Sequence, residues 1–206
     1  MVAPLGVSPV LAAPATDELG QLPAPGFVLA VGTLEPRKNL PRLVAAYGAL
    51  PRALQAQHPL VVVGARGWRT GETIAALASL GERCLLLGHV SDAALAELYR
   101  RCAVFCYPSL AEGFGLPVLE AMSAGAAVLT SNRSSLPEVG GDAVRYADPE
   151  SAASIASELE RLLESESSRA QLAALARERA ATFSWDAFAE AVLRSLTAAA
   201  GAAQGP

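Results

Sequence analysis

The chain of 206 residues predicts a doubly wound α/β fold, with a parallel sheet of about six strands followed by C-terminal helices. Short continuous apolar runs alternate with longer segments of helical periodicity, and such runs suit strands buried on both faces. Right-handed crossovers between parallel strands then cover both faces of the sheet with helices. After residue 149 only helical patterns follow.

The expected strands are six apolar runs, and the first three end in a glycine that lets the chain turn away from the sheet. These runs cover residues 27–32, 60–64, 84–88, 103–107 and 126–130, with a weaker one at 143–146.

The expected helices begin at residues that can accept hydrogen bonds from free backbone amides. Asn39 can cap the first helix, with Pro41 in its first turn, and Ser91 can cap another, with Asp92 favouring the helix dipole. Ser184 is a plausible cap for the last helix. The expected helices cover residues 39–50, 73–80, 91–101 and 117–124, and then 149–164, 168–182 and 185–199.

Composition sets the domain organisation and excludes several classes of function. Residues 1–26, rich in Pro, Ala and Gly, predict a linker, residues 27–197 the folded domain and residues 198–206 a frayed tail. The net charge of −4 argues against nucleic-acid binding. No apolar run reaches the roughly 20 residues of a membrane span. Residues 1–26 also lack the pattern of a signal peptide. Three unpatterned cysteines, 84, 102 and 106, indicate a reduced protein, which we expect to be cytoplasmic.

Three loops that follow strands carry glycines or polar residues, namely 32–39, 88–92 and 109–116. In sheets of this class, ligands bind beyond the carboxyl ends of the strands. We therefore expect these loops to share one edge of the sheet and to form the ligand site.

The most informative segment runs from Glu112 to Glu120, with the sequence EGFGLPVLE. A glycine-flexible loop before a helix can present backbone N–H groups to a phosphate. The two acids could then hold hydroxyl groups on either side of a diphosphate, and a ligand of that kind is a nucleotide sugar. The alternative is a turn with two surface acids, in which Glu120 only stabilises the helix start by roughly 0.3–1 kcal/mol.

Arg37 and Lys38 precede the first helix and could form an anion site, or simply a solvated basic pair. A glycosidase needs a general acid for a poor leaving group, and nothing here visibly raises the pKa of either acid. A diphosphate leaving group needs cations and N–H donors instead, which favours transfer over hydrolysis.

Other motifs are absent from the sequence. It has no Asp-x-Asp, no G-x-G-x-x-G after the first strand and no phosphate-binding G-x-x-x-x-G-K-[ST], and its two histidines are far apart, so we expect no metal and no cofactor. Ser109, Ser131 and Ser134 have no nearby histidine for a catalytic triad. We expect Trp68 and Trp185 to be packing residues.

Four stretches of the sequence resemble the C-terminal, donor-binding half of retaining GT-B glycosyltransferases of group 1 (GT4), whose fold is Rossmann-like. They are VGTLEPRKNLPRLVAAY, GHVSDAALAELYRRCAVFCYPSLAEGFGLPVLEAMSAGAAVLTSN, PEVGGDAVRYADPES and FSWDAFAEAVL, and they cover most of residues 27–196. The E-x7-E segment is the specific signature of this resemblance. Residues 31–40 look most like mannosyltransferases.

The resemblance implies a role for each candidate residue. Arg37, Lys38 and Glu112 would be catalytic, with the two cations on the donor diphosphate and Glu112 on sugar hydroxyls. Glu120 would hold the ribose hydroxyls of a GDP- or UDP-sugar. Many members carry arginine where Thr33 stands; Arg37 would compensate for this departure, and Lys38 matches the family lysine better than Arg37 does. The remaining donor-binding positions would be Gly32, Thr33, Gly88, Val90, Gly113, Phe114, Gly115 and Leu116.

The resemblance also implies that a second domain supplies the acceptor site and a histidine of the catalytic cleft. We therefore expect this chain to bind the donor, to transfer little alone and to self-associate through the exposed cleft face. The full-length enzyme would be cytoplasmic or peripheral at the inner membrane. The alternatives are a non-catalytic or partner-dependent binding module and, more weakly, a sugar-nucleotide epimerase of the same fold.

Overall fold

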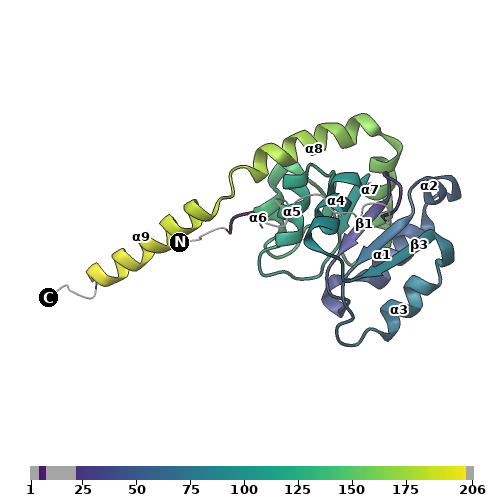
Figure 1. Ribbon diagram of the computed structural model, residues 1–206, viewed down its shortest axis with the longest axis horizontal. Coiled ribbons are helices and arrows are strands. Elements are labelled where there is room, and N and C mark those ends of the chain that lie inside the picture. Colours follow the sequence, from purple (N-terminus) through teal and green to yellow (C-terminus); the bar gives the residue numbers. More distant parts are fainter. Residues whose placement is uncertain (1–4, 8–21, 203–206) are drawn as a thin grey trace.

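A computed structural model describes residues 5–7 and 22–202 of the protein (Figure 1). Most of the predicted linker and the last four residues lie outside the described part. The described residues form a six-stranded parallel sheet in the order β3-β2-β1-β4-β5-β6. Its strands are β1 Val28–Val31, β2 Leu60–Val63, β3 Cys84–Gly88, β4 Val104–Tyr107, β5 Val128–Ser131 and β6 Arg145–Ala147. The predicted fold class and strands are thereby confirmed.

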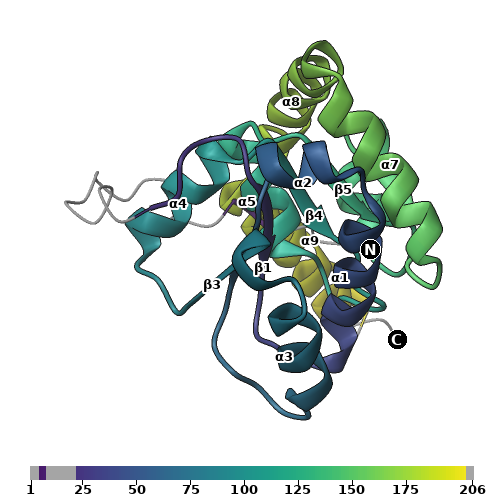
Figure 2. The same ribbon diagram turned by 90° about the vertical axis from the view of Figure 1, so that its right-hand side faces the viewer.

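The helices divide between the two faces of the sheet, as continuous apolar strands require. In Figure 2, α1 and α7 lie to the right of the strands and α4 to the left. The α-helices are α1 Leu40–Ala49, α2 Arg52–Gln57, α3 Gly71–Ala78, α4 Asp92–Arg101, α5 Leu116–Ala124, α6 Leu136–Gly140, α7 Ala152–Glu164, α8 Glu166–Ala180 and α9 Trp185–Ala202, and short 3₁₀ turns are η3 Pro36–Lys38, η4 Gly81–Arg83 and η5 Gly141–Ala143.

Alternate residues of each central strand face different cores. In β1, Val28 and Ala30 pack with α1, α3 and α7, whereas Leu29 packs with α4, α5 and α6. The side chains on both faces of such a strand are therefore removed from water. Burial of each large apolar side chain stabilises the fold by about 1.5–3 kcal/mol. This two-sided burial explains why the strands read as continuous apolar runs.

Several helix boundaries differ from the expectation. Pro51 ends α1 and is followed at once by α2, which the sequence pattern missed, as it also missed the short α6. The hydroxyls of Ser91 and Ser184 accept hydrogen bonds from the amides of Ala94 and Ala187, so both predicted caps are confirmed. The helix α9 extends to residue 202, beyond the expected end, and projects away from the body of the domain (Figure 1).

The chain order places a topological switch between β1 and β4. From β1 the chain moves outward through β2 to β3, and then returns to the other side of β1 to form β4, β5 and β6. The loops after β1 and β4 consequently leave neighbouring strands in opposite directions. A crevice at such a point is where sheets of this class bind ligands.

Candidate functional site

The loops that leave β1 and β4 meet at this switch point through the carboxylate of Glu112. Arg37 Nη1 lies 2.6 Å from Glu112 Oε2, and Lys38 Nζ lies 2.8 Å from Glu112 Oε1. The side chains of Lys38 and Glu112 are only 9% and 7% exposed, whereas that of Arg37 is 46% exposed. The structure thus brings together the three residues that the sequence analysis predicted to be catalytic.

Tyr107, the last residue of β4, completes this cluster. Its hydroxyl donates to Glu112 Oε1 at 2.8 Å and accepts a hydrogen bond from Lys38. The ammonium group of Lys38 also lies 4.7 Å from the centre of the tyrosine ring, where a cation–π attraction adds to the ion pair. The ring is fixed in turn by stacking on Phe105.

Burial opposes ionisation of Glu112. The hydrogen bond and the charge attraction of Lys38, together with the hydrogen bond from Tyr107, outweigh this effect and lower the pKa of the carboxyl. Burial and the adjacent carboxylate both raise the pKa of Tyr107, so its hydroxyl remains a donor at neutral pH. Partial burial opposes the charge of Arg37, yet its contact with Glu112 raises the pKa of the guanidinium. The cluster therefore holds two cations and one anion.

The loop after β1 is held in place by Asn39, but not in the way that the sequence predicted. Asn39 adopts a left-handed conformation, with φ of 61°, and its side chain makes no capping hydrogen bond to α1. Its amide Nδ2 instead donates to the carbonyl oxygens of Pro108 at 2.9 Å and Pro149 at 2.7 Å. Leu110 N also donates to Arg37 O at 2.8 Å. These bonds fasten the loops after β1 and β4 to each other.

The loop from Glu112 to Leu116 is held by two serines that follow β5. Ser134 Oγ accepts from the amide of Glu112 at 2.9 Å, and Ser135 Oγ donates to the carbonyl oxygens of Glu112 and Phe114. Gly115 precedes α5 with φ of 104°, and a Cβ there would meet Leu136 Cδ2 at 2.7 Å. Only glycine fits this position, so the loop can turn directly into the N-terminus of α5.

Glu120 lies in the second turn of α5, not in the first, because the helix begins at Leu116 and no acidic residue occupies its first turn. The hydroxyl of Tyr99 in α4 donates to Glu120 Oε2 at 2.9 Å. Burial and the nearby carboxylate raise the pKa of Tyr99. Stabilisation of the helix start therefore does not explain this acid, which is instead oriented by a neighbouring helix.

Other predicted donor-binding residues are placed less uniformly. Gly32 lies against Lys38, whose Cε would be 3.0 Å from an added Cβ, and Thr33 is exposed. Gly113 is exposed, with nothing within 4 Å of an added Cβ. The ring of Phe114 packs edge-on against Phe183.

The loop after β3 lies beside the loop after β2 and is not part of the Glu112 cluster. Gly88 O accepts from Gly64 N at 2.8 Å, and Val90 packs against the core on the α4 side. In the sheet order, β3 is separated from β1 by β2. A ligand that reached both places would have to extend along the edge of the sheet.

Comparison with known proteins identifies the family. The model for "Glycosyl transferases group 1" matches residues 17–179. The chain belongs to the group 1 glycosyltransferases.

This group 1 glycosyltransferase chain is 42% identical over 169 residues to the O-antigen chain mannosyltransferase B of Escherichia coli, covering 81% of this chain and 44% of the relative. It is 34% identical over 174 residues to the phosphatidyl-myo-inositol mannosyltransferase of Mycolicibacterium smegmatis, covering 82% of this chain and 44% of the relative. The chain therefore spans less than half the length of these relatives.

Solved structures confirm that the chain has the Rossmann-like fold of about half of a GT-B glycosyltransferase. A sucrose-phosphate synthase from Thermosynechococcus elongatus superposes with a TM-score of 0.79 at 29% identity, covering 97% of this chain and 53% of that one. WaaG, a glycosyltransferase involved in lipopolysaccharide biosynthesis, superposes with a TM-score of 0.77 at 23% identity, covering 93% and 55%. At the latter identity the likeness concerns the fold alone.

Sequence reasoning missed several residues that organise the site of this group 1 glycosyltransferase. Tyr107 was read only as the end of an apolar strand, although a tyrosine at the carboxyl end of a buried strand was a usable signal. Glu35, which pairs with Arg37 at 2.6 Å, carried no such signal. Ser134 and Ser135 reach the site only because β5 is the neighbour of β4 in the sheet.

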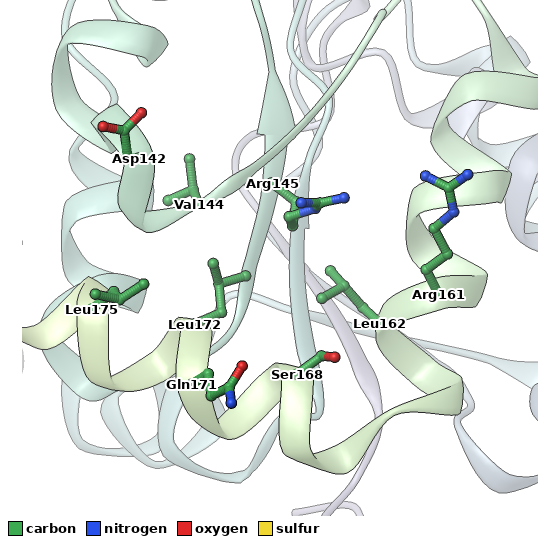
Figure 3. Close-up of a pocket in the computed structure, with 9 residues that line it drawn as sticks. All are labelled: Asp142, Val144, Arg145, Arg161, Leu162, Ser168, Gln171, Leu172 and Leu175. Atoms are coloured by element: carbon green, nitrogen blue, oxygen red, sulfur yellow. The ribbon is translucent and has the colours of Figure 1, made fainter.

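A second hollow lies away from the switch point, among β6, α7 and α8 (Figure 3). This cavity of about 430 Å³ has an apolar floor that includes Leu162 and Leu172. Its two arginines, Arg145 and Arg161, both contact Glu158. The strand β6 is at the edge of the sheet, and β5 separates it from β4, whose loop carries Glu112. The cavity is therefore not part of the Glu112 cluster.

Within residues 5–7 and 22–202, no group of three or more His, Cys, Asp and Glu side chains is arranged to hold a metal ion. No helix in the same part of the chain is long and apolar enough to cross a membrane.

Proposed function

We propose that this chain binds a nucleotide diphosphate sugar and forms the donor half of a retaining, metal-independent mannosyltransferase. The observation that carries the proposal is the convergence of Arg37, Lys38 and Glu112 from two loops at the switch point. Two cations beside the N-terminus of a nine-residue helix match the charge and geometry of a diphosphate.

Each part of the donor has a matching feature. The cations of Arg37 and Lys38 take the diphosphate, assisted by backbone amides of Gly113 to Leu116. Glu112 accepts hydrogen bonds from sugar hydroxyls, and Glu120, which Tyr99 orients, accepts those of the ribose. The Gly88–Val90 loop borders the base at the β3 side of the same edge.

The proposed reaction is a sugar transfer in which Arg37 and Lys38 supply positive charge at the leaving diphosphate. The bond between the anomeric carbon and the leaving phosphate oxygen breaks, and the acceptor hydroxyl oxygen bonds to the same face of that carbon. The hydroxyl proton passes to the leaving phosphate oxygen. Arg37 and Lys38 stabilise the charge that develops on the diphosphate, and this electrostatic assistance is the role that we assign to a metal ion in metal-dependent transferases.

Mannose is the sugar that the relatives favour, because the proteins with 39–42% identity to this chain are named mannosyltransferases. Another solved structure of similar fold, HepE from Anabaena, contains UDP and glucose. The affinities of this chain for guanosine and uridine nucleotides and for their mannose and glucose derivatives therefore need to be compared directly. GDP-mannose is our proposed donor.

We propose that the reacting end of the acceptor is held by the part of the relatives that this chain does not span. We expect the chain alone to bind the donor with little or no transfer. Transfer of labelled mannose by the purified chain would contradict this half-enzyme interpretation, whereas donor binding without turnover is the expected result.

Calorimetric titration of GDP, GDP-mannose, UDP and UDP-glucose tests the proposal. We expect GDP-mannose to bind most tightly, and Lys38→Ala and Glu120→Ala each to weaken it at least tenfold. Arg194→Ala and Glu190→Ala are matched controls, since these residues form an exposed pair on α9. Absence of nucleotide binding at millimolar concentration would refute the donor site, and equal affinity of all four variants would refute the residue roles.

A further inference from the structure

Trp68 is exposed beside the donor site, contrary to the expectation that it packs. Its side chain belongs to the loop after β2, and the residue is 57% exposed. The ring is nevertheless oriented, because Nε1 donates to Glu35 Oε2 at 3.2 Å. Glu35 in turn pairs with Arg37, whose other carboxylate partner is Glu112. The exposed ring is therefore connected to the donor cluster by a continuous chain of polar contacts.

The loop that carries Trp68 is tightly fastened, so its exposure does not result from a loose backbone. Leu34 N donates to Ala65 O at 2.9 Å, and Gly67 N donates to Leu34 O at 3.2 Å. A Cβ at Gly67 would lie 2.7 Å from Leu34 O, so a larger residue could not approach the β1 loop as closely. The fold thus holds a large aromatic side chain in water at a defined place.

Arg69 connects this ring to a neighbouring cavity. It adopts a left-handed conformation with φ of 52°, which is uncommon for a residue with a side chain. Its guanidinium carbon lies 5.6 Å from the centre of the Trp68 ring. Arg69 also lines a cavity of about 450 Å³ together with Arg42, Glu72 and Leu110.

The cavity and the donor site share the turn η3. Pro36 and Asn39, at either end of the segment that carries Arg37 and Lys38, both line the cavity. The wall residue Leu110 is hydrogen-bonded through its amide to Arg37 O. A molecule in the cavity would therefore lie within reach of the loop that is proposed to hold the donor diphosphate.

We propose that Trp68, Arg69 and this cavity form a subsite for pyranose rings of an acceptor glycan. An aromatic face suits the C–H face of a pyranose, and arginine and glutamate supply donors and acceptors for its hydroxyl groups. A mixed lining of apolar and convergent polar groups is typical of small-molecule sites.

A sugar fits the position of this subsite better than the donor base does. Trp68 is tied through Glu35 to Arg37 and Glu112, at the end of the donor where the sugar is proposed to lie. The loop assigned to the base follows β3 and meets the β2 loop at Gly64, whereas the part of the β2 loop next to Trp68 is hydrogen-bonded through Ala65 and Gly67 to Leu34 in the β1 loop. This inference rests on the proposed function for the identity of the glycan, but it predicts binding that can be measured separately from the donor.

Tryptophan fluorescence tests the subsite directly. The chain contains two tryptophans, so Trp185→Phe leaves Trp68 as the sole reporter. We expect α-linked mannotriose to change its emission saturably, and GDP at saturation to leave that change intact. In calorimetry, Trp68→Ala should weaken mannotriose binding at least tenfold, whereas Trp185→Ala, the matched change of the other exposed tryptophan, should not.

The outcomes separate this inference from the proposed function. Normal GDP binding without mannotriose binding up to 50 mM, a concentration of the order expected for very weak sites, would overturn the subsite and leave the donor site standing. Equal mannotriose affinity of Trp68→Ala and wild type would also overturn it. If the wild type binds mannotriose but does not bind GDP, only the donor proposal is refuted.

Discussion

Replacing Tyr107 by phenylalanine tests whether the cluster at the switch point is organised by that hydroxyl. The change keeps the ring, its stacking on Phe105 and the cation–π contact with Lys38, and removes one oxygen. That oxygen donates to Glu112 and accepts from Lys38. Because Lys38 and Glu112 still pair with each other at 2.8 Å, neither charge is left without a partner.

The expected loss is set by hydrogen bonds to charged groups, each worth about 1.5–3 kcal/mol. Since the remaining ion pair compensates in part, we expect Tyr107→Phe to lower the free energy of unfolding by about 2 kcal/mol. A change of this size lowers the melting temperature of a chain of this length by roughly 4–8 °C. Freed from the hydroxyl, Lys38 and Glu112 hold their positions less well, so GDP should bind about tenfold more weakly, which corresponds to about 1.4 kcal/mol.

The pH dependence gives an independent reading. Despite its burial, Glu112 has a lowered pKa in the folded protein, and Tyr107 contributes to this. A lowered carboxyl pKa stabilises the fold above the unfolded value, which is about 4.3, and this stability disappears as the pH falls through the folded value. Tyr107→Phe raises the folded pKa, so its acid unfolding should begin at a higher pH than that of the wild type.

Tyr47→Phe is the matched control. Its hydroxyl is buried against α2 and lies 3.0 Å from the carbonyl oxygens of Gln55 and His58, away from the switch point. We expect a loss of about 1 kcal/mol, typical of neutral hydrogen bonds, with GDP affinity unchanged. If both variants bind GDP like the wild type and unfold at the same acid pH, Tyr107 does not organise the cluster.

Three further predictions separate binding from folding in and around the segment from Glu112 to Glu120. Gly115→Ala forces a side chain into a left-handed conformation and against Leu136, so chemical denaturation should show a loss of about 1–3 kcal/mol. Gly113→Ala, with nothing within 4 Å of its new Cβ, should keep the stability of the wild type and weaken GDP-mannose in calorimetry; unchanged affinity would count against a ligand there. Tyr99→Phe removes the donor that orients Glu120 and should weaken GDP about fivefold, or about 1 kcal/mol, with a much smaller effect on 2′-deoxy-GDP; equal losses for both nucleotides would argue against a ribose contact.

The sheet was predictable from the sequence because its signal is local. A strand buried on both faces must be apolar throughout, so six short runs identified the strands, and a glycine after each of the first three located where the chain turns. The candidate site was predictable to the level of loops, since parallel strands place their carboxyl ends at one edge. The pairing of Glu112 with Arg37 and Lys38 across 75 and 74 positions of sequence was not, because it depends on strand order.

Asn39 and Phe114 have contacts that local sequence patterns do not reveal. Asparagine is a common helix cap, but the side-chain amide of Asn39 donates to two carbonyl groups 69 and 110 positions away, and the residue adopts a left-handed conformation. Phe114 was predicted from its motif to line the donor site, and nothing in the sequence indicated that its ring packs on Phe183, which follows α8. In both residues a distant partner, invisible in the sequence window, determines the side chain's direction.

The unequal exposure of the two cations indicates how the site can accept a diphosphate without leaving a buried charge unpaired. Lys38 is buried between Tyr107 and Glu112, and separating a buried ion pair by removing one partner costs about 3–5 kcal/mol, so this pair should persist when the donor binds. Arg37 is half exposed and is shared by Glu35 and Glu112, so it can exchange a carboxylate for a phosphate oxygen at little cost. Glu112 would then retain Lys38 and Tyr107 on Oε1 and release Oε2 toward the sugar. The same acid can therefore neutralise the empty site and offer a hydrogen-bond acceptor to the bound donor.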